Sequence, residues 1–350
     1  MQRVYERPAD ERVNWVGNIP FLAVHLAPLA AFWTDVTPTA VIMAVVLYAT
    51  RMFFITGVYH RYFAHRSYKM GRAMQFLMAL GGTTAVQKGP LWWAGHHRHH
   101  HKFSDQPEDV HSPLKGFFWS HMGWIMCRKY NPTPTEQIKD FARFPELRWL
   151  DRFHYLPPIA LGVASFLVGG WSGLVVGFFL STVVLWHCTY MINSLTHLFG
   201  RRRFVTTDTS RNSLVLALLT FGEGWHNNHH YYQSAANQGF FWWEIDISYY
   251  VLRLLSVIRL VHGIRTPPAH VLLSHRIRDG HADIGMFQAS WARAVAHLEN
   301  ARRQTGERYE DRKRALQDMV AATTRSAEEF AEMTRVALRK PLPVKVGGPR

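Results

Sequence analysis

Long uncharged stretches alternate along the chain with segments rich in polar and basic residues. Residues 153–200 contain no Asp, Glu, Lys or Arg, residues 13–34 form a second uncharged run, and residues 36–59 contain a single arginine. A membrane-spanning helix needs roughly 20 apolar residues. The first stretch is therefore long enough for two spans, and the second and third are each long enough for one. The pattern predicts an all-α integral membrane protein with four transmembrane helices in two hairpins. The predicted spans cover residues 13–33, 38–59, 153–169 and 173–197, with the glycine-rich break at 169–173 between the last two.

The remaining segments are expected to form a helical cap at one end of these spans. Residues 60–152 and 198–262 supply this cap, so that residues 1–262 make up the membrane domain. Within the cap, residues 240–260 mix aromatic and charged side chains, which predicts an interfacial amphipathic helix. Residues 263–350 are expected to be a basic cytoplasmic C-terminal extension.

The distribution of basic residues predicts which side of the membrane the termini and the cap occupy. The net charge is +15 and the pI is about 10.1, yet the predicted hairpin tips carry no Lys or Arg. The positive-inside rule therefore places both termini and the cap on the cytoplasmic side. A bacterial inner membrane is expected in preference to the endoplasmic reticulum. No groove-reading motif accompanies the basic charge, so nucleic-acid binding is not expected. Arg51, inside a span, can either face the helix bundle or extend toward the membrane surface.

Histidines gather at the cytoplasmic ends of the predicted spans. Two triplets have the i, i+3, i+4 spacing that places side chains on one helical face. His60 and His65 are five residues apart, about 140° around an ideal helix, so they can meet only if the helix ends or distorts between them. Asn193 and His197 are four apart at the end of the last predicted span. The candidate metal ligands are His60, His65, His97, His100, His101, His197, His226, His229 and His230.

The number and type of these side chains indicate a redox metal centre. Imidazole nitrogens suit iron, zinc, copper and nickel, and nine of them are too many for one ion. Two ions with five or six ligands each would use them all. Zinc has no redox role, whereas iron would create an oxygen-activating site, so iron is preferred. His96 and His99 are interpreted as neighbours of the site, and His111 and His121 as undecided candidates beside it.

Five motifs resemble those of the membrane fatty-acyl desaturases of the stearoyl-CoA (delta-9) type. They are HRYFAH at 60–65, HRHHHKFS at 97–104, GFFWSHMGW at 116–124, NSLTH at 193–197 and GEGWHNNHH at 222–230. The resemblance covers roughly residues 15–260. It implies a di-iron centre held by the nine histidines, with Asn193 contacting an iron through water. It also implies an O2-dependent, two-electron reaction that introduces a cis double bond into a saturated acyl chain.

The resemblance further implies how the substrate is held. Gln87, Trp93 and Thr189 match three residues that shape the bend of the acyl tunnel in that family. Arg128 and Lys129 match basic residues that contact the CoA phosphates. The acyl-CoA enzymes carry Arg-Asp immediately before the second histidine motif, whereas this chain has Gly95-His96. The carrier of the acyl chain, CoA, a lipid or a carrier protein, is therefore left open.

Two other functions are compatible with parts of this pattern. A di-iron lipid hydroxylase could use the same site, and its product would gain oxygen instead of losing two hydrogens. A membrane metal transporter would place its ligands near the middle of the spans, whereas these lie at their ends. Electrons are expected from a separate ferredoxin-, rubredoxin- or cytochrome-type donor with its reductase.

Overall fold

The computed structural model describes Pro8, residues 10–277 and residues 317–318, 321–322, 325, 328–329 and 332. Most of the predicted basic extension at 263–350 lies outside the described residues. The chain divides into two units, of which the one spanning Tyr5–Pro268 contains every residue proposed for the site.

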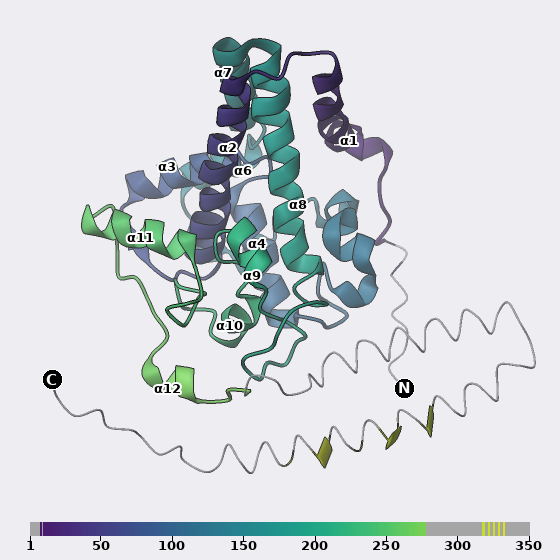
Figure 1. Cartoon of the computed structure of the whole chain (residues 1–350), viewed down its shortest axis with the longest axis vertical. Helices are drawn as coiled ribbons and strands as arrows, with labels where there is room; N and C mark the ends of the chain where they lie inside the picture. Colours follow the sequence, from purple (N-terminus) through teal and green to yellow (C-terminus); the bar gives the residue numbers. More distant parts are fainter. Residues whose placement is uncertain are drawn as a thin grey trace, which may run out of the picture. The chain divides into compact units, whose positions relative to one another are not determined.

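That larger unit is mostly helical (Figure 1). Its α-helices are α1 (Ile19–Leu26), α2 (Pro38–Phe53), α3 (Arg72–Thr83), α4 (Pro90–Phe103), α5 (Lys139–Ala142), α6 (Pro145–Arg152), α7 (Leu156–Ser172), α8 (Ser181–Ser194), α9 (Leu214–Leu219), α10 (His226–Tyr231) and α11 (Ile247–Val257). π-Helical segments cover Phe54–Ala64, Trp119–Gly123 and Gly173–Leu180. Short 3-10 helices cover Val16–Asn18, Ala27–Phe32, Pro113–Lys115, Trp124–Met126, Arg128–Tyr130 and Thr135–Gln137. The larger unit also contains two short strands, β1 (Lys69–Met70) and β2 (Val261–His262), which pair antiparallel. The other unit contributes α12 (Ala269–Leu273).

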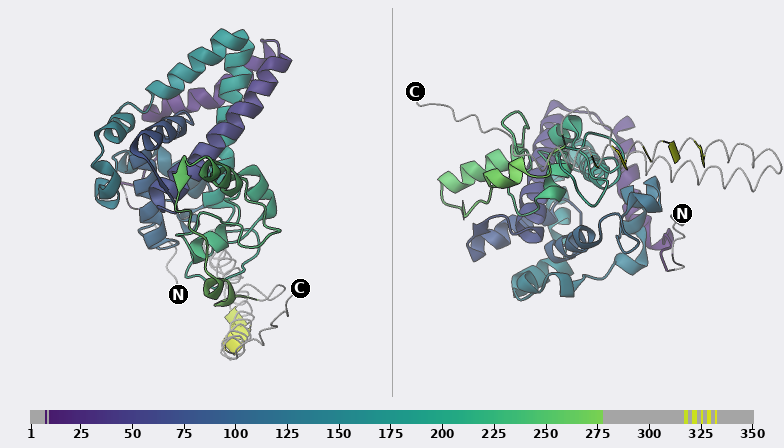
Figure 2. Two further views of the ribbon diagram at one scale, coloured as in Figure 1. Left: turned by 90° about the vertical axis from the view of Figure 1, so that its left-hand side faces the viewer. Right: turned by 90° about the horizontal axis from the view of Figure 1, so that it is seen from below.

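Within the part of the chain that the structure describes, two helical stretches are long and apolar enough to cross a membrane: Pro38–Ala64 and Leu156–Ser194. The first begins sharply because the Thr37 hydroxyl accepts a hydrogen bond from the Ala40 amide and Pro38 occupies the first helical position. The second is broken at Gly170, whose φ of +59° is non-helical. The chain folds back there, so that α7 and α8 form a hairpin (Figure 2). This break lies in the predicted turn at 169–173.

The first predicted span differs from expectation. Residues 13–33 do not form one continuous α-helix, because α1 is only eight residues long and is flanked by 3-10 helices at Val16–Asn18 and Ala27–Phe32. Pro20 and Pro28 lack the amide hydrogen that an uninterrupted α-helix would use, which is consistent with this segmentation.

Arg51 faces the helix bundle. Its Nη1 donates a hydrogen bond to Thr182 Oγ1 at 2.7 Å, and its Nη2 donates to Ser181 Oγ at 2.6 Å. The side chain is fully buried, so the alternative of extension toward the membrane surface does not apply. Hydroxyl acceptors on α8 thus compensate for the burial of a charge on α2.

Below α2 (Figure 1), the π-helical segment Phe54–Ala64 packs against α4. His197, just beyond the end of α8, has its Nε2 3.1 Å from Nε2 of His226 at the start of α10. The largest apolar core is in this region and includes Tyr59, Phe63 and Tyr68. The predicted amphipathic helix at 240–260 is wrong in its first part, because α11 begins only at Ile247. The preceding residues are non-helical, and two of them, Glu244 and Asp246, turn buried carboxylates inward.

Candidate metal centre

Nine imidazoles gather in two groups beneath the long helices. The first, the five-histidine cluster, comprises His60, His65, His97, His101 and His229. The second, the four-histidine cluster, comprises His100, His197, His226 and His230. Within each cluster, one ring nitrogen from every member lies within 4.8 Å of those of the others. The structure thus brings together all nine residues that the sequence proposes as ligands.

A π-helical segment solves the spacing problem of the first motif. Residues five apart diverge on an α-helix, but the amide of His65 donates to the carbonyl oxygen of His60 at 3.1 Å, an i→i+5 hydrogen bond. The two rings consequently face one another with centroids 4.7 Å apart. This is the helix distortion that the five-residue spacing requires.

Each histidine triplet is shared between the two clusters. On α4, His97 and His101 are one turn apart and join the five-histidine cluster, while His100 joins the other. On α10, His229 joins the five-histidine cluster, while His226 and His230 join the four-histidine cluster. Both helices therefore lie between the clusters and hold them at a fixed separation.

The spacing of the nitrogen atoms in the five-histidine cluster fits a bound cation. His229 Nε2 lies 3.0 Å from His60 Nε2 and 2.9 Å from His101 Nε2. His97 Nε2 lies 2.9 Å from His101 Nε2 and 3.2 Å from His65 Nε2. One ring nitrogen has either one proton or one lone pair, so hydrogen bonds cannot satisfy this whole set. Metal–nitrogen bonds of about 2.0–2.1 Å at right angles place adjacent ligands roughly 3 Å apart, which matches these separations.

Four carboxylates orient ligand rings by contacting the Nδ1 atom of a histidine. The pairs are Glu223 with His60 Nδ1, Asp109 with His100 Nδ1 at 3.0 Å, Asp105 with His197 Nδ1 at 3.3 Å and Asp208 with His230 Nδ1 at 2.6 Å. A carboxylate accepts, so Nδ1 carries the proton and Nε2 keeps its lone pair for a metal. Accordingly, the buried Nε2 of His230 has no hydrogen-bond partner among the described residues. These four carboxylates are functional residues that the sequence motifs do not predict.

Electrostatics favour the neutral form of the four imidazoles His65, His97, His101 and His229. Burial, and then the neighbouring imidazoles, lower the pKa values of His65, His97, His101 and His229 well below the ordinary value. Burial opposes ionisation of Asp208, but its imidazole partner holds the pKa of this carboxyl well below its usual range. Neutral imidazoles backed by ionised carboxylates are suited to binding a cation.

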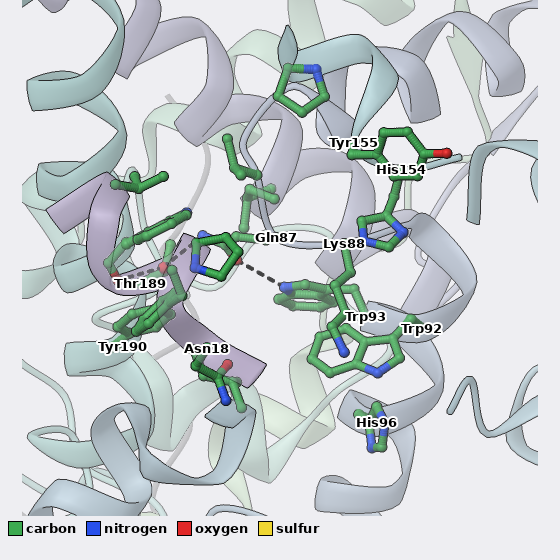
Figure 3. A pocket seen from close by; sticks show the side chains of 18 of the residues that line it. Asn18, Gln87, Lys88, Trp92, Trp93, His96, His154, Tyr155, Thr189 and Tyr190 are labelled. Atoms are coloured by element: carbon green, nitrogen blue, oxygen red, sulfur yellow. Dashed lines mark hydrogen bonds between the residues drawn. The ribbon is translucent and has the colours of Figure 1, made fainter. Parts of the chain in front are cut away.

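A cavity of about 860 Å³ reaches the clusters and is lined largely by apolar and aromatic side chains. His60, His97 and His226 form part of its wall. Figure 3 shows another part, where Trp93 Nε1 donates to Gln87 Oε1 at 3.1 Å and Gln87 Nε2 donates to Thr189 Oγ1 at 2.9 Å. The three residues proposed from the sequence for the tunnel bend are therefore one hydrogen-bonded unit in the cavity wall.

The other proposed site residues are placed differently. Asn193 lines the same cavity. Arg128 and Lys129 are exposed and are not among the residues that line it. Lys129 Nζ instead forms an ion pair with Asp10 Oδ2 at 3.0 Å.

The two undecided histidines, His111 and His121, interact with other polar side chains. The ring of His111 lies 4.2 Å from that of His100, next to Asp109. His121 lies away from both clusters and interacts with His187 Nδ1 and Ser194 Oγ, each at 3.0 Å.

The fold and the site define a class of protein: mostly helical, with long apolar helices of membrane type and two histidine clusters that could hold metal ions. Known proteins with similar sequences narrow this class. The family described as fatty acid desaturase matches residues 37–272. The chain is 38% identical over 73% of its length to the sn-1 stearoyl-lipid 9-desaturase of Anabaena variabilis, of which it covers 94%.

Two further relatives agree. The chain is 40% identical over 73% of its length to the sn-1 stearoyl-lipid 9-desaturase of a Synechocystis strain, covering 81% of that protein. It is 34% identical over 75% of its length to the sn-2 palmitoyl-lipid 9-desaturase of a Nostoc strain, covering 94%. The chain therefore belongs to the fatty acid desaturase family and is an oxidoreductase.

Proposed function

We propose that the protein is an acyl-lipid 9-desaturase, which introduces a cis double bond into a saturated chain carried on a lipid. The observation that carries this proposal is the meeting of two histidine clusters with a large apolar cavity. The names of the relatives support the lipid carrier and the bond position. An acyl chain in the cavity would pass the hydrogen-bonded unit of Gln87, Trp93 and Thr189 and then the histidines.

Two iron ions are the proposed cofactor. The five-histidine and four-histidine clusters would hold one each, with Asn193 contacting a metal through water. Iron in these clusters would supply the O2 chemistry needed to remove hydrogen from an unactivated methylene, which side-chain acids and bases cannot do. The proposed balance is one saturated chain, O2, two electrons and two protons, giving one cis-alkene and two waters.

The contribution of the chain's own residues is placement and exclusion of water. The four carboxylates fix the ligand rings, and the apolar wall keeps solvent from the reacting carbons. Gln87 and its two partners determine the shape of the wall beside the histidines, and hence which carbon lies next to them. Electrons would come from a separate ferredoxin-, rubredoxin- or cytochrome-type donor with its reductase.

The proposed membrane arrangement has four spans, with both termini and the cap in the cytoplasm and a bacterial inner membrane as the site. It is supported by the two arms of the Leu156–Ser194 hairpin and by Pro38–Ala64. The fourth span would be the segmented stretch Val16–Phe32. Exposed Val41, Ile42 and Val45 along α2 present the kind of surface that lipid covers.

Lipid analysis tests the function. The chain and its His229→Ala variant would be expressed with a compatible electron donor and iron, at matched protein levels. We expect lipids containing a cis-9 monoene with the native chain and none with the variant. Hydroxylated chains would instead indicate the alternative reaction, and an unchanged lipid profile with iron-loaded protein would refute the proposal.

A further inference from the structure

Lys88 is the single Lys or Arg side chain among the described residues that line the cavity. It precedes α4 and follows Gln87 directly. Figure 3 shows its side chain extending alongside Trp92, with His154 and Tyr155 near the same part of the cavity. The cavity therefore has one lysine, in a wall that is otherwise mostly apolar and aromatic.

The Lys88 ammonium lacks a counter-charge. Its Nζ donates to Asn131 Oδ1 at 3.0 Å and lies 4.3 Å from the centroid of the Trp92 ring. An ammonium has three donors, and no described carboxylate lies within ion-pair distance of this one. Burial lowers the pKa of Lys88 to about 8, although Asp151 opposes the shift from a greater distance. A partly desolvated and unpaired cation is costly, and an anionic oxygen in the cavity would compensate for it.

Several other basic side chains that are withdrawn from solvent have carboxylate partners, whereas the buried Arg51 is held by the hydroxyls of Ser181 and Thr182. Arg61 pairs with Asp246, Lys115 with Glu11 and Arg98 with Asp140. Lys88 differs from both groups, because its Nζ donates to one amide oxygen and its side chain lines the cavity. This coincidence points to a substrate group as the missing partner.

The backbone at Lys88 is also unusual. Its φ is +62°, in the left-handed region where glycine is favoured and a lysine is strained. Strain of this kind is retained at functional positions when a particular side chain is needed there. It also provides a useful variant, because glycine at this position relieves the strain instead of disturbing the fold.

We propose that Lys88 binds the phosphodiester of an anionic glycerophospholipid whose acyl chain occupies the cavity. This inference rests on the proposed acyl-lipid function and specifies the class of lipid. One ammonium matches the single charge of a phosphodiester, whereas CoA carries several phosphate charges and would require several cations. Along α4, Pro90 and His97 are separated by about 10 Å at 1.5 Å per residue, a length similar to that of an acyl chain from its ester to the ninth carbon.

The experiment compares iron-loaded native protein with Lys88→Gly and Lys88→Gln in vesicles of two compositions. One contains distearoyl phosphatidylglycerol and the other contains uncharged distearoyl monogalactosyldiacylglycerol, with stearoyl-CoA as a third substrate. Lys139→Gln, on exposed α5, removes the same charge elsewhere. Binding of phosphatidylglycerol is measured separately by titration, so that one readout does not depend on turnover.

Both Lys88 variants should bind phosphatidylglycerol about tenfold more weakly, with kcat/KM on this lipid falling by a similar factor, because a charge-assisted hydrogen bond is lost. Turnover of the galactolipid and the behaviour of Lys139→Gln should stay within about twofold of the native protein. Equal losses on both lipids, or no loss on either, would overturn the assignment to a phosphodiester. A native enzyme that converts only stearoyl-CoA would refute the proposed acyl-lipid function itself, together with the lysine assignment.

Discussion

Asp246→Asn tests whether the ligand-bearing segments depend on a buried ion pair. Arg61 lies between His60 and His65 in sequence, and its guanidinium is 1% exposed. Its Nη1 lies 2.8 Å from Asp246 Oδ1, and its Nη2 lies 3.0 Å from Glu223 Oε1. Asp246 also accepts from the Tyr249 amide at the start of α11, a capping role that asparagine performs equally well. The substitution therefore removes the charge and one acceptor oxygen, since Asp246 Oδ2 accepts from the Gln238 amide at 2.6 Å and an amide nitrogen would not.

The expected loss of unfolding free energy depends on the burial of this ion pair. Breaking a buried ion pair by removing one partner costs about 3–5 kcal/mol, and Arg61 retains Glu223, so we expect a loss at the lower end, about 3 kcal/mol. For a unit of this size, each kcal/mol shifts Tm by roughly 2–4 °C, which gives an expected decrease of roughly 6–12 °C. Since Glu223 also orients His60, a displaced Arg61 should reduce the bound iron as well.

The assay is thermal unfolding of purified protein in detergent, with iron content measured on the same samples. Glu146→Gln is the matched control, because Arg72 donates to Glu146 at 2.7 Å in an exposed pair. Such surface pairs contribute about 0–1 kcal/mol, so this variant should unfold within a few degrees of the native protein. Equal shifts for the two variants would refute the reasoning that burial decides the cost.

Two other substitutions probe the metal centre and the cavity. Asp208→Asn replaces the charged acceptor that fixes His230 with a neutral amide, and we expect metal affinity to fall by about 10–100-fold in a chelator competition. Unchanged affinity would show that the ring does not need the carboxylate charge. Gln87→Leu leaves Trp93 Nε1 without its acceptor and Thr189 Oγ1 without its donor, at about 1–3 kcal/mol for an unsatisfied buried group. The wall should then change shape and broaden the double-bond positions seen by mass spectrometry, while a single unchanged position would argue against a role in placement.

The ligands could be predicted from the sequence because helical spacing is local information. The i, i+3, i+4 pattern identified the members of each triplet, and the five-residue gap after His60 predicted a distorted helix. The same rule suggested one shared face for each triplet, whereas α4 and α10 each lie between the two clusters. Which side of a helix meets which neighbour is decided by tertiary packing, and spacing alone carries no information about it.

The carboxylates that orient the ligand rings could not be predicted from the sequence, because their contacts are also set by tertiary packing. Asp105 pairs with His197 across 92 positions, and Glu223 contacts both His60 and Arg61 across more than 160. A lone acidic residue in a polar segment has no sequence pattern that distinguishes it from a solvated one. The missed signal is compositional: carboxylates within or beside a histidine motif, such as Glu223, are candidates for orienting imidazoles.

The segment before α11 shows what such long-range contacts achieve. Asp246 holds Arg61, within the first histidine motif, and Glu244 Oε2 accepts from Asn228 Nδ2 at 2.8 Å, within the last motif. Between them, the Ile245 carbonyl accepts from Trp225 Nε1 at 2.8 Å. Three consecutive residues thus connect the ligand-bearing segments without contacting a ligand nitrogen themselves. Because each bond is to a residue adjacent to or between ligands, the segment can fix their relative positions while the coordinating atoms stay free for metal.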